Sequence, residues 1–229
     1  MRTLAIVPAY NEGKSIYSVA ERIRAYNSNI DIAVINDGSS DNTYTEAKRA
    51  KVVVINLLSN LGIGGAVQTG YLYALRNGYD IAIQVDGDDQ HDPSDIAKLL
   101  EVIERDEADI VIGSRYVKKT GYKGSMTRRL GNKYFSLLIF FLTKQLCYDT
   151  TSGFRAVNRK VIQMFSEYYP RDYPEVETIV YAANKGMRIS EVPVCMKNRR
   201  HGKSSITFNK AAYYMVKVTA ALILQLNRG

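Results

Sequence analysis

Short apolar runs alternate with longer amphipathic stretches along the first half of the chain. The runs are rich in β-branched residues and almost continuously hydrophobic, which is typical of strands buried on both faces of a sheet. They cover residues 3–9, 31–35, 52–57, 81–85 and 109–113. Between them, the spacing of apolar side chains and the capping residues predict helices over 15–27, 41–50, 63–77 and 93–105. This alternation predicts an α/β fold with a mostly parallel sheet flanked by helices.

Polar, turn-forming segments follow four of the predicted strands. In chain order they are Pro8-Ala9-Tyr10-Asn11-Glu12, Asn36-Asp37-Gly38-Ser39-Ser40-Asp41, Asn60-Leu61-Gly62-Ile63-Gly64-Gly65-Ala66 and Asp86-Gly87-Asp88-Asp89-Gln90-His91. Each one alone is also good turn and helix-capping chemistry. Ligands of parallel sheets bind beyond the carboxyl ends of the strands. Four such segments in succession therefore predict a ligand site at this edge.

Asp86 and Asp88 are the sharpest local signal for chemistry. They bracket one small residue at the end of a buried strand, so both carboxylates can converge on a divalent cation. Hard oxygen ligands suit Mg²⁺ or Mn²⁺, which commonly keep water and take phosphate oxygens. The alternative is a solvated acidic turn that caps the helix beginning at Pro93.

Charge is unevenly distributed along the sequence. The chain has 31 Lys and Arg against 23 Asp and Glu, a net charge of +8. Eleven acids lie between residues 80 and 109, whereas residues 115–133 hold seven bases and no acid. This pattern indicates a cation site beside an anion site, although two solvated faces would give it too. Most of the basic excess lies in two short segments that lack the interleaved stacking aromatics of a known nucleic-acid-binding module, so we do not expect nucleic acid to be the partner.

The sequence predicts no secreted or membrane-spanning protein. Two cysteines and no signal peptide indicate reduced thiols and a cytoplasmic setting. The longest charge-free apolar stretches, 134–143 and 218–226, fall short of the roughly 18 to 20 residues of a spanning helix. Apolar helices at 134–142 and 208–226 carry bases beside or among their apolar residues. They could lie on the anionic inner face of the membrane, or pack on the domain or on each other in a homo-oligomer.

The strand-end motifs, in their order and spacing, resemble those of family 2 glycosyltransferases of the GT-A fold. Further segments are similar to the polyprenyl-phosphate (dolichol-phosphate) hexosyltransferase branch: Gly113-Ser114-Arg115-Tyr116, Arg128-Arg129, Thr151-Ser152-Gly153-Phe154-Arg155-Ala156 and Arg199-x-x-Gly202-x-Ser204. The resemblance covers nearly the whole chain. It implies a Rossmann-like GT-A domain over 1–205, followed by an amphipathic C-terminal helix over 206–229.

The resemblance also implies roles for individual residues. The nucleotide of a UDP- or GDP-sugar donor would contact Pro8, Tyr10, Glu12, Asp37 and Asp86. The metal, Mg²⁺ or Mn²⁺, would be held by Asp86, Asp88 and Gln90. The acceptor phosphate or donor diphosphate would be held by Arg115, Arg128, Arg129, Arg199 and Ser204, and the catalytic set would be Asp86, Asp88, Arg115 and Arg129. The chain departs from the family pattern at Asp89, where an apolar residue is frequent, and in lacking the membrane-spanning region of many members.

The acceptor decides which catalytic groups are needed. A polyprenyl phosphate has a second pKa of about 6 and is already mostly a dianion at neutral pH. It needs arginines for charge neutralisation rather than a general base, and in-line attack inverts the anomeric centre. A sugar-hydroxyl acceptor, as in polysaccharide extension, would instead require a carboxylate base. The candidates are Asp149, Glu175 and Glu177, for which the alternatives are a cap near Thr150 and first-turn helix positions after Pro174.

Overall fold

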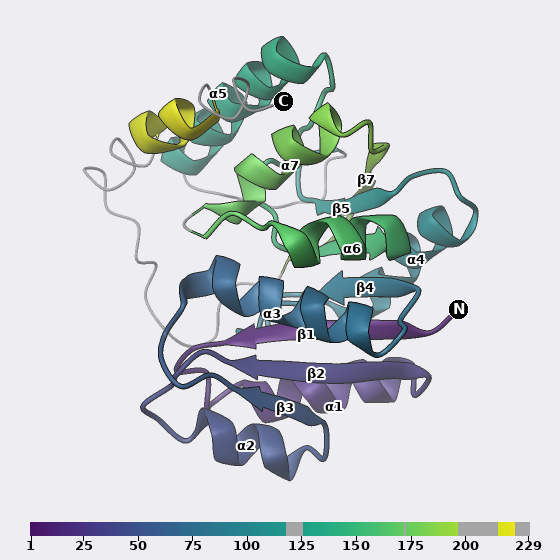
Figure 1. Ribbon diagram of the computed structural model, residues 1–229, viewed down its shortest axis with the longest axis vertical. Coiled ribbons are helices and arrows are strands. Elements are labelled where there is room, and N and C mark those ends of the chain that lie inside the picture. The colour runs from purple at the N-terminus through teal and green to yellow at the C-terminus, as the bar shows by residue number, and fades with distance from the viewer. Residues whose placement is uncertain (118–125, 172, 197–214, 223–229) are drawn as a thin grey trace.

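A seven-stranded sheet lies between two layers of helices in the computed structural model, which describes residues 1–117, 126–171, 173–196 and 215–222 (Figure 1). The strands are β1 (Thr3–Ala9), β2 (Ile30–Asn36), β3 (Val53–Asn56), β4 (Ile81–Gln84), β5 (Ile110–Ser114), β6 (Arg155–Asn158) and β7 (Ile189–Pro193). Their order is β3-β2-β1-β4-β6-β5-β7, and only β6 runs antiparallel to its neighbours. The predicted α/β fold is thus confirmed.

The helices divide between the two faces of the sheet. They are α1 (Ile16–Tyr26), α2 (Thr43–Arg49), α3 (Gly62–Arg76), the 3₁₀ turn η1 (Pro93–Asp95), α4 (Ile96–Glu104), α5 (Met126–Thr143), α6 (Arg159–Glu167) and α7 (Pro174–Asn184), with a further helical segment at 215–222. The first four predicted helices correspond to α1 to α4, with ends shifted by a few residues.

Alternation along β1 shows how the sheet separates two cores. Leu4 and Ile6 pack with α3, α6 and α7, whereas Ala5 and Val7 pack with α1, α2 and α4. All four side chains are fully buried. A strand buried on both faces needs apolar residues at every position, which explains its unbroken hydrophobic run.

The antiparallel strand β6 brings its preceding loop to the same sheet edge as the carboxyl ends of the parallel strands. Arg155, the first residue of β6, pairs in register with Gln84 of β4 and is buried. Its guanidinium donates to the carbonyl oxygens of Ser152 (2.8 Å) and Glu175 (2.6 Å) and to Thr178 Oγ1 (2.7 Å). Arg155 therefore ties the first turn of α7 to this edge.

Helix α5 packs one face on the domain and exposes the other. Phe135 and Ile139 are buried in the same cluster as Val218 and Leu222 of segment 215–222. On the outer side lie five large apolar side chains that are between 42% and 78% exposed. They recur every three or four residues, and we call them the α5 stripe: Met126, Leu130, Tyr134, Leu137 and Phe141.

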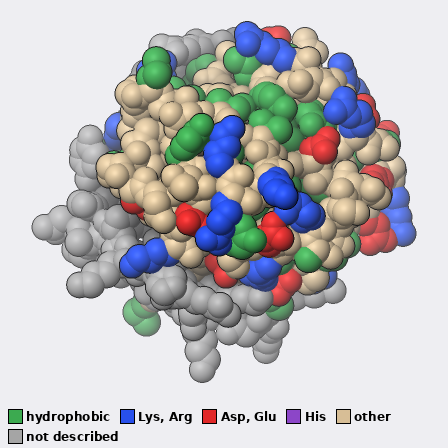
Figure 2. Space-filling view, turned by 90° about the horizontal axis from the view of Figure 1, so that it is seen from below, with side chains coloured by type: hydrophobic (Ala, Val, Ile, Leu, Met, Phe, Trp, Pro, Cys, Tyr) green, Lys and Arg blue, Asp and Glu red, His purple; other side chains and the backbone are tan. Residues whose placement is uncertain are grey.

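The expected boundary at residues 205 and 206 lies outside the described residues. Within the described ranges, no helix combines the length and apolarity that crossing a membrane requires. Figure 2 shows the face at the bottom of Figure 1, where basic and acidic side chains are interspersed rather than gathered by sign. The basic excess of the sequence is therefore not concentrated on this face.

Candidate active site

A cleft of about 430 Å³ opens at the carboxyl ends of β1, β2 and β4. All five residues expected to contact the nucleotide line it, together with Asp88, which was expected to hold the metal. The complete described lining is Pro8, Ala9, Tyr10, Glu12, Asp37, Asn60, Gly62, Ile63, Ala66, Asp86, Gly87, Asp88 and Glu175. The segments that follow four of the predicted strands thus meet in one cavity.

Hydrogen bonds join the loop after β1 to the loop after β2. Asn11, in a left-handed conformation (φ 56°), donates its backbone N–H to Ser39 Oγ at 2.9 Å. Its side-chain oxygen accepts the backbone N–H of Ser40 at 2.9 Å. The backbone N–H of Glu12 donates to Thr43 Oγ1 at 2.8 Å. These reciprocal bonds hold the Tyr10–Glu12 wall of the cleft against the end of β2.

Asp37 joins the end of β2 to the start of α3. It is buried, and its Oδ1 accepts the backbone N–H of Leu61 at 2.7 Å. The next residue, Gly38, has φ +65°, and a Cβ there would lie 2.8 Å from the backbone nitrogen of Asn60. Only glycine combines this backbone conformation with so close an approach. The turn chemistry therefore places Asp37 at the floor of the cleft.

Asp86 is oriented by His91. Its Oδ2 lies 3.0 Å from His91 Nε2, and the imidazole stacks on Phe154 with ring centroids 4.6 Å apart. Burial by itself raises the pKa of Asp86, but hydrogen bonds with His91 and Gln84 and the charges of His91 and Arg115 bring it below its usual value. Asp86 is therefore a carboxylate at neutral pH.

Asp88 and Asp89 have different surroundings although they are adjacent. Asp88 Oδ1 accepts the backbone N–H of Gln90 at 3.1 Å, and Asp88 lines the cleft. Asp89 is in a left-handed conformation and forms an ion pair with Arg22 of α1. The extra acid at this departure from the family pattern is thus compensated by a base. Gln90 is half-buried but is not part of the cleft lining.

The donor set of the cleft suits a hard divalent cation. Its described lining holds five carboxylates, from Glu12, Asp37, Asp86, Asp88 and Glu175, and no Lys or Arg. A diphosphate would be repelled there unless a cation compensated the charge. Among the described residues no group of three His, Cys, Asp or Glu side chains forms a ready metal cage. Mg²⁺ typically needs one or two carboxylates and takes its other ligands from water and phosphate, which this arrangement permits.

Glu175 reaches the cleft from α7, far from the strand-end segments in sequence. It lies in the first turn of that helix after Pro174, as expected. Burial and the neighbouring Asp86 carboxylate raise the pKa of Glu175 above its usual value. No local motif marks it for the cleft, because its position depends on how α7 packs on the sheet.

Arg115 is not part of the cleft lining and forms a buried ion pair with Asp149. Its Nε and Nη2 donate to the two Asp149 carboxylate oxygens at 2.7 and 2.6 Å, and its backbone N–H donates to Oδ2 at 2.9 Å. Nη2 also contacts Thr151 Oγ1 at 2.9 Å. Asp149 therefore binds Arg115 rather than capping a helix, and it does not line the cleft.

The other expected phosphate-binding residues are distributed differently. Arg128 and Arg129 are exposed on the first turn of α5 and are not part of the cleft lining. Arg199 and Ser204 lie outside the described residues. A common site for Arg115, Arg128, Arg129, Arg199 and Ser204 therefore stays a prediction.

Comparisons with known proteins agree with this geometry. The family model described as glycosyl transferase family 2 matches residues 4–165. The chain is 34% identical over 209 residues to a UDP-N-acetylglucosamine–dolichyl-phosphate N-acetylglucosaminyltransferase of Methanococcus voltae, covering 82% of this chain and 83% of the relative. It is 30% identical over 227 residues to a polyprenol monophosphomannose synthase of Mycolicibacterium smegmatis, covering 95% and 85%. The chain belongs to glycosyl transferase family 2, and its resemblance to the polyprenyl-phosphate branch is confirmed.

A solved structure shares the fold. Glucosyl-3-phosphoglycerate synthase from Mycobacterium tuberculosis, in complex with Mn²⁺, uridine diphosphate and glucosyl-3-phosphoglycerate, superposes with a TM-score of 0.75. The alignment covers 98% of this chain and 79% of that one, at 20% sequence identity. This likeness supports the GT-A arrangement of the sheet and helices.

Proposed function

We propose that this protein transfers a hexose from a UDP- or GDP-sugar to a polyprenyl phosphate, with inversion at the anomeric carbon. The observation that carries the proposal is the strand-end cleft, because it is lined by Pro8, Tyr10, Glu12, Asp37 and Asp86, the residues that the family resemblance assigns to the nucleotide. The names of both relatives support the acceptor, because one specifies transfer to dolichyl phosphate and the other synthesis of a polyprenol monophosphomannose.

Asp86 and Asp88 would hold Mg²⁺ or Mn²⁺ between the protein and the donor diphosphate. When bound, the cation supplies electrostatic stabilisation of the charge that grows on the leaving nucleotide diphosphate. The protein's part is to keep Asp86 ionised and correctly oriented, which His91 and the stacked Phe154 do. Asp37 and the fastened loops around it give the nucleotide a preformed wall.

A phosphate acceptor is consistent with the state of Asp149. A dianionic phosphate oxygen attacks without giving up a proton, so no general base is required. Asp149 is fully buried and bound through both oxygens to Arg115, which leaves it poorly placed to take a proton from an acceptor in the cleft. Arg129, on the exposed start of α5, would contribute to neutralising the acceptor phosphate.

The α5 stripe would place the enzyme on the cytoplasmic face of the membrane that holds its lipid acceptor. The sequence of α5 contains no acid, and Arg128, Arg129 and Lys133 are exposed along it. An apolar stripe with flanking bases binds an anionic bilayer interface through apolar burial and charge together. Peripheral attachment would bring a membrane-embedded phosphate to a cleft in the aqueous domain.

Transfer can be tested with a panel of radiolabelled nucleotide sugars and undecaprenyl phosphate, with and without EDTA. We expect one UDP- or GDP-sugar to give label that extracts into organic solvent, and EDTA to abolish it. Arg129→Ala should reduce transfer much more than nucleotide binding. Label that stays on free sugar or appears only on a saccharide would contradict the lipid acceptor.

One observation supports a second candidate, a transferase that extends a saccharide at a hydroxyl. Glu175 lines the cleft and its raised pKa suits a general base better than an ordinary carboxylate. In that case Glu175→Gln would abolish transfer while donor binding stayed intact. The lipid-phosphate enzyme would instead retain transfer at saturating donor.

A further inference from the structure

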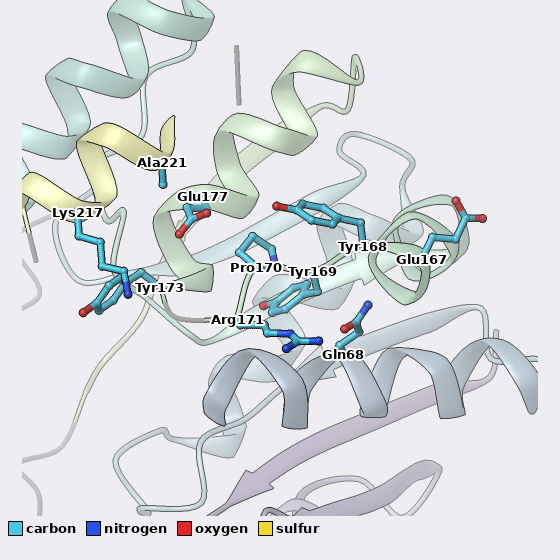
Figure 3. A pocket seen from close by; sticks show the side chains of 10 residues that line it. All are labelled: Gln68, Glu167, Tyr168, Tyr169, Pro170, Arg171, Tyr173, Glu177, Lys217 and Ala221. Atoms are coloured by element: carbon cyan, nitrogen blue, oxygen red, sulfur yellow. The ribbon is translucent and has the colours of Figure 1, made fainter. Parts of the chain in front are cut away.

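Two acids of one helical turn face two different cavities. Glu175 lines the strand-end cleft, whereas Glu177 lines a second cavity of about 480 Å³ between α3, α7 and segment 215–222. Figure 3 shows Glu177 in that second cavity, with Tyr173 and Lys217 at the same end. Both positions favour an acid through the helix dipole, so the dipole alone does not explain why Glu175 points into the cleft.

Glu175 differs from the other four carboxylates of the cleft in its hydrogen bonds. The side chain of each of the other four is hydrogen-bonded to another residue. The partners are Ser15 for Glu12, Leu61 for Asp37, His91 for Asp86 and Gln90 for Asp88. In the described part of the chain, no other residue donates a hydrogen bond to the carboxylate of Glu175, although this carboxylate lines the cleft. A partly buried carboxylate has many acceptor sites, and leaving them unfilled is costly.

The backbone beneath Glu175 is held rigidly. Arg155 Nη2 donates to the carbonyl oxygen of Glu175 at 2.6 Å, and Arg155 Nη1 donates to Thr178 Oγ1 at 2.7 Å one turn later. Thr178 in turn donates to the carbonyl oxygen of Pro174. Since Arg155 and Thr178 are buried, the backbone from which the Glu175 side chain projects toward the cleft is held in place by the protein itself.

We propose that Glu175 binds the hydroxyl groups of the donor sugar and thereby determines which nucleotide sugar the enzyme accepts. This inference rests on the proposed function. Phosphate groups are repelled by a carboxylate, whereas neutral hydroxyls are the donors that an unfilled carboxylate needs. Within a nucleotide sugar, hydroxyls lie on the hexose beyond the diphosphate, and Glu175 lies in the same cleft as the Asp86 and Asp88 pair that would face that diphosphate.

Titration calorimetry in the presence of Mn²⁺ separates this role from others. The ligands are UDP, GDP and whichever of UDP-glucose, UDP-N-acetylglucosamine and GDP-mannose binds the wild-type enzyme most tightly. Glu175→Gln should weaken binding of the nucleotide sugar at least tenfold, because a hydrogen bond to a charged group is lost. Its affinity for the free nucleotide diphosphate should stay within about twofold, since that ligand has no hexose.

Glu177→Gln is the matched control, because it makes the same chemical change two residues away in the other cavity. Glu177→Gln should change neither the affinity for the nucleotide sugar nor the affinity for the free nucleotide diphosphate. Equal weakening of nucleotide and nucleotide sugar by Glu175→Gln, or no weakening of either, would overturn the assignment. A variant that binds the nucleotide sugar normally but fails in transfer would also overturn it, in favour of a general base. Absence of any nucleotide binding by the wild type would instead overturn the proposed function and this assignment with it.

Discussion

Replacing Asp149 by asparagine should destabilise the protein more than any comparable change at a surface acid. Arg115 and Asp149 are 6% and 0% exposed, and three hydrogen bonds join them. Removing one partner of a buried ion pair leaves the other charge without compensation and costs about 3 to 5 kcal/mol. Asparagine keeps one acceptor oxygen, so we expect a value of about 3 kcal/mol. For a chain of this size that corresponds to a fall in Tm of roughly 6 to 12 °C.

Urea unfolding followed by circular dichroism measures this cost directly. Asp149→Asn, Arg115→Gln and the double variant form a cycle, and the double variant should cost clearly less than the two single losses together. The control is Asp106→Asn, which makes the same change in a pair whose acid is 84% exposed, and which should cost less than about 1 kcal/mol. A loss below about 1 kcal/mol for Asp149→Asn, or additive single effects, would refute the reasoning.

Three further predictions concern other parts of the molecule. Hydrogen bonds from Arg188 lower the pKa of Asp109 from 3.8 to about 2. The ionised carboxylate therefore stabilises the folded protein by about 2 kcal/mol above pH 4, and this contribution is lost as the pH falls toward 2. The difference in unfolding free energy between wild type and Asp109→Asn should shrink over the same pH range. Gly64→Ala should destabilise the protein by about 2 kcal/mol, since its Cβ would lie 2.1 Å from Pro170 O. Gly131→Ala, whose Cβ would have nothing within 4 Å, should stabilise α5 slightly. Thermal melts should show a lower Tm for the first variant and a slightly higher Tm for the second, and the opposite change in either would contradict the prediction. Leu137→Glu on the α5 stripe should weaken sedimentation with vesicles containing anionic phospholipid about tenfold or more, and unchanged binding would count against the membrane-facing assignment.

The strands that the sequence predicts are those whose apolar run is continuous. The run at 3–9 matches β1 because every side chain there is buried on one face or the other. Strand β6 escapes prediction because it is short and begins with Arg155, a residue that is normally exposed. Its burial depends on acceptors at Ser152, Glu175 and Thr178, which only the folded chain brings together.

Among the site residues too, those that a local sequence pattern marks could be predicted, whereas those placed by contacts between distant parts of the chain could not. Pro8 lies at the carboxyl end of β1, and Tyr10, Asp37 and Asp86 follow strands that end at the same edge, so a local pattern and a topological rule together predict that they meet. Glu175 lies on α7, and the contacts that place this helix, including those of Arg155 with its first turn, join residues that are distant in sequence. The pairing of Arg115 with Asp149, 34 residues away, likewise has no sequence signal of its own.

A crystal structure with UDP or GDP and Mn²⁺ would test the central claim most directly. The account predicts nucleotide density in the cleft lined by Tyr10 and Asp37, and an anomalous manganese peak between the diphosphate and the carboxylates of Asp86 and Asp88. A nucleotide bound elsewhere on the molecule, or a manganese ion held away from both aspartates, would contradict it.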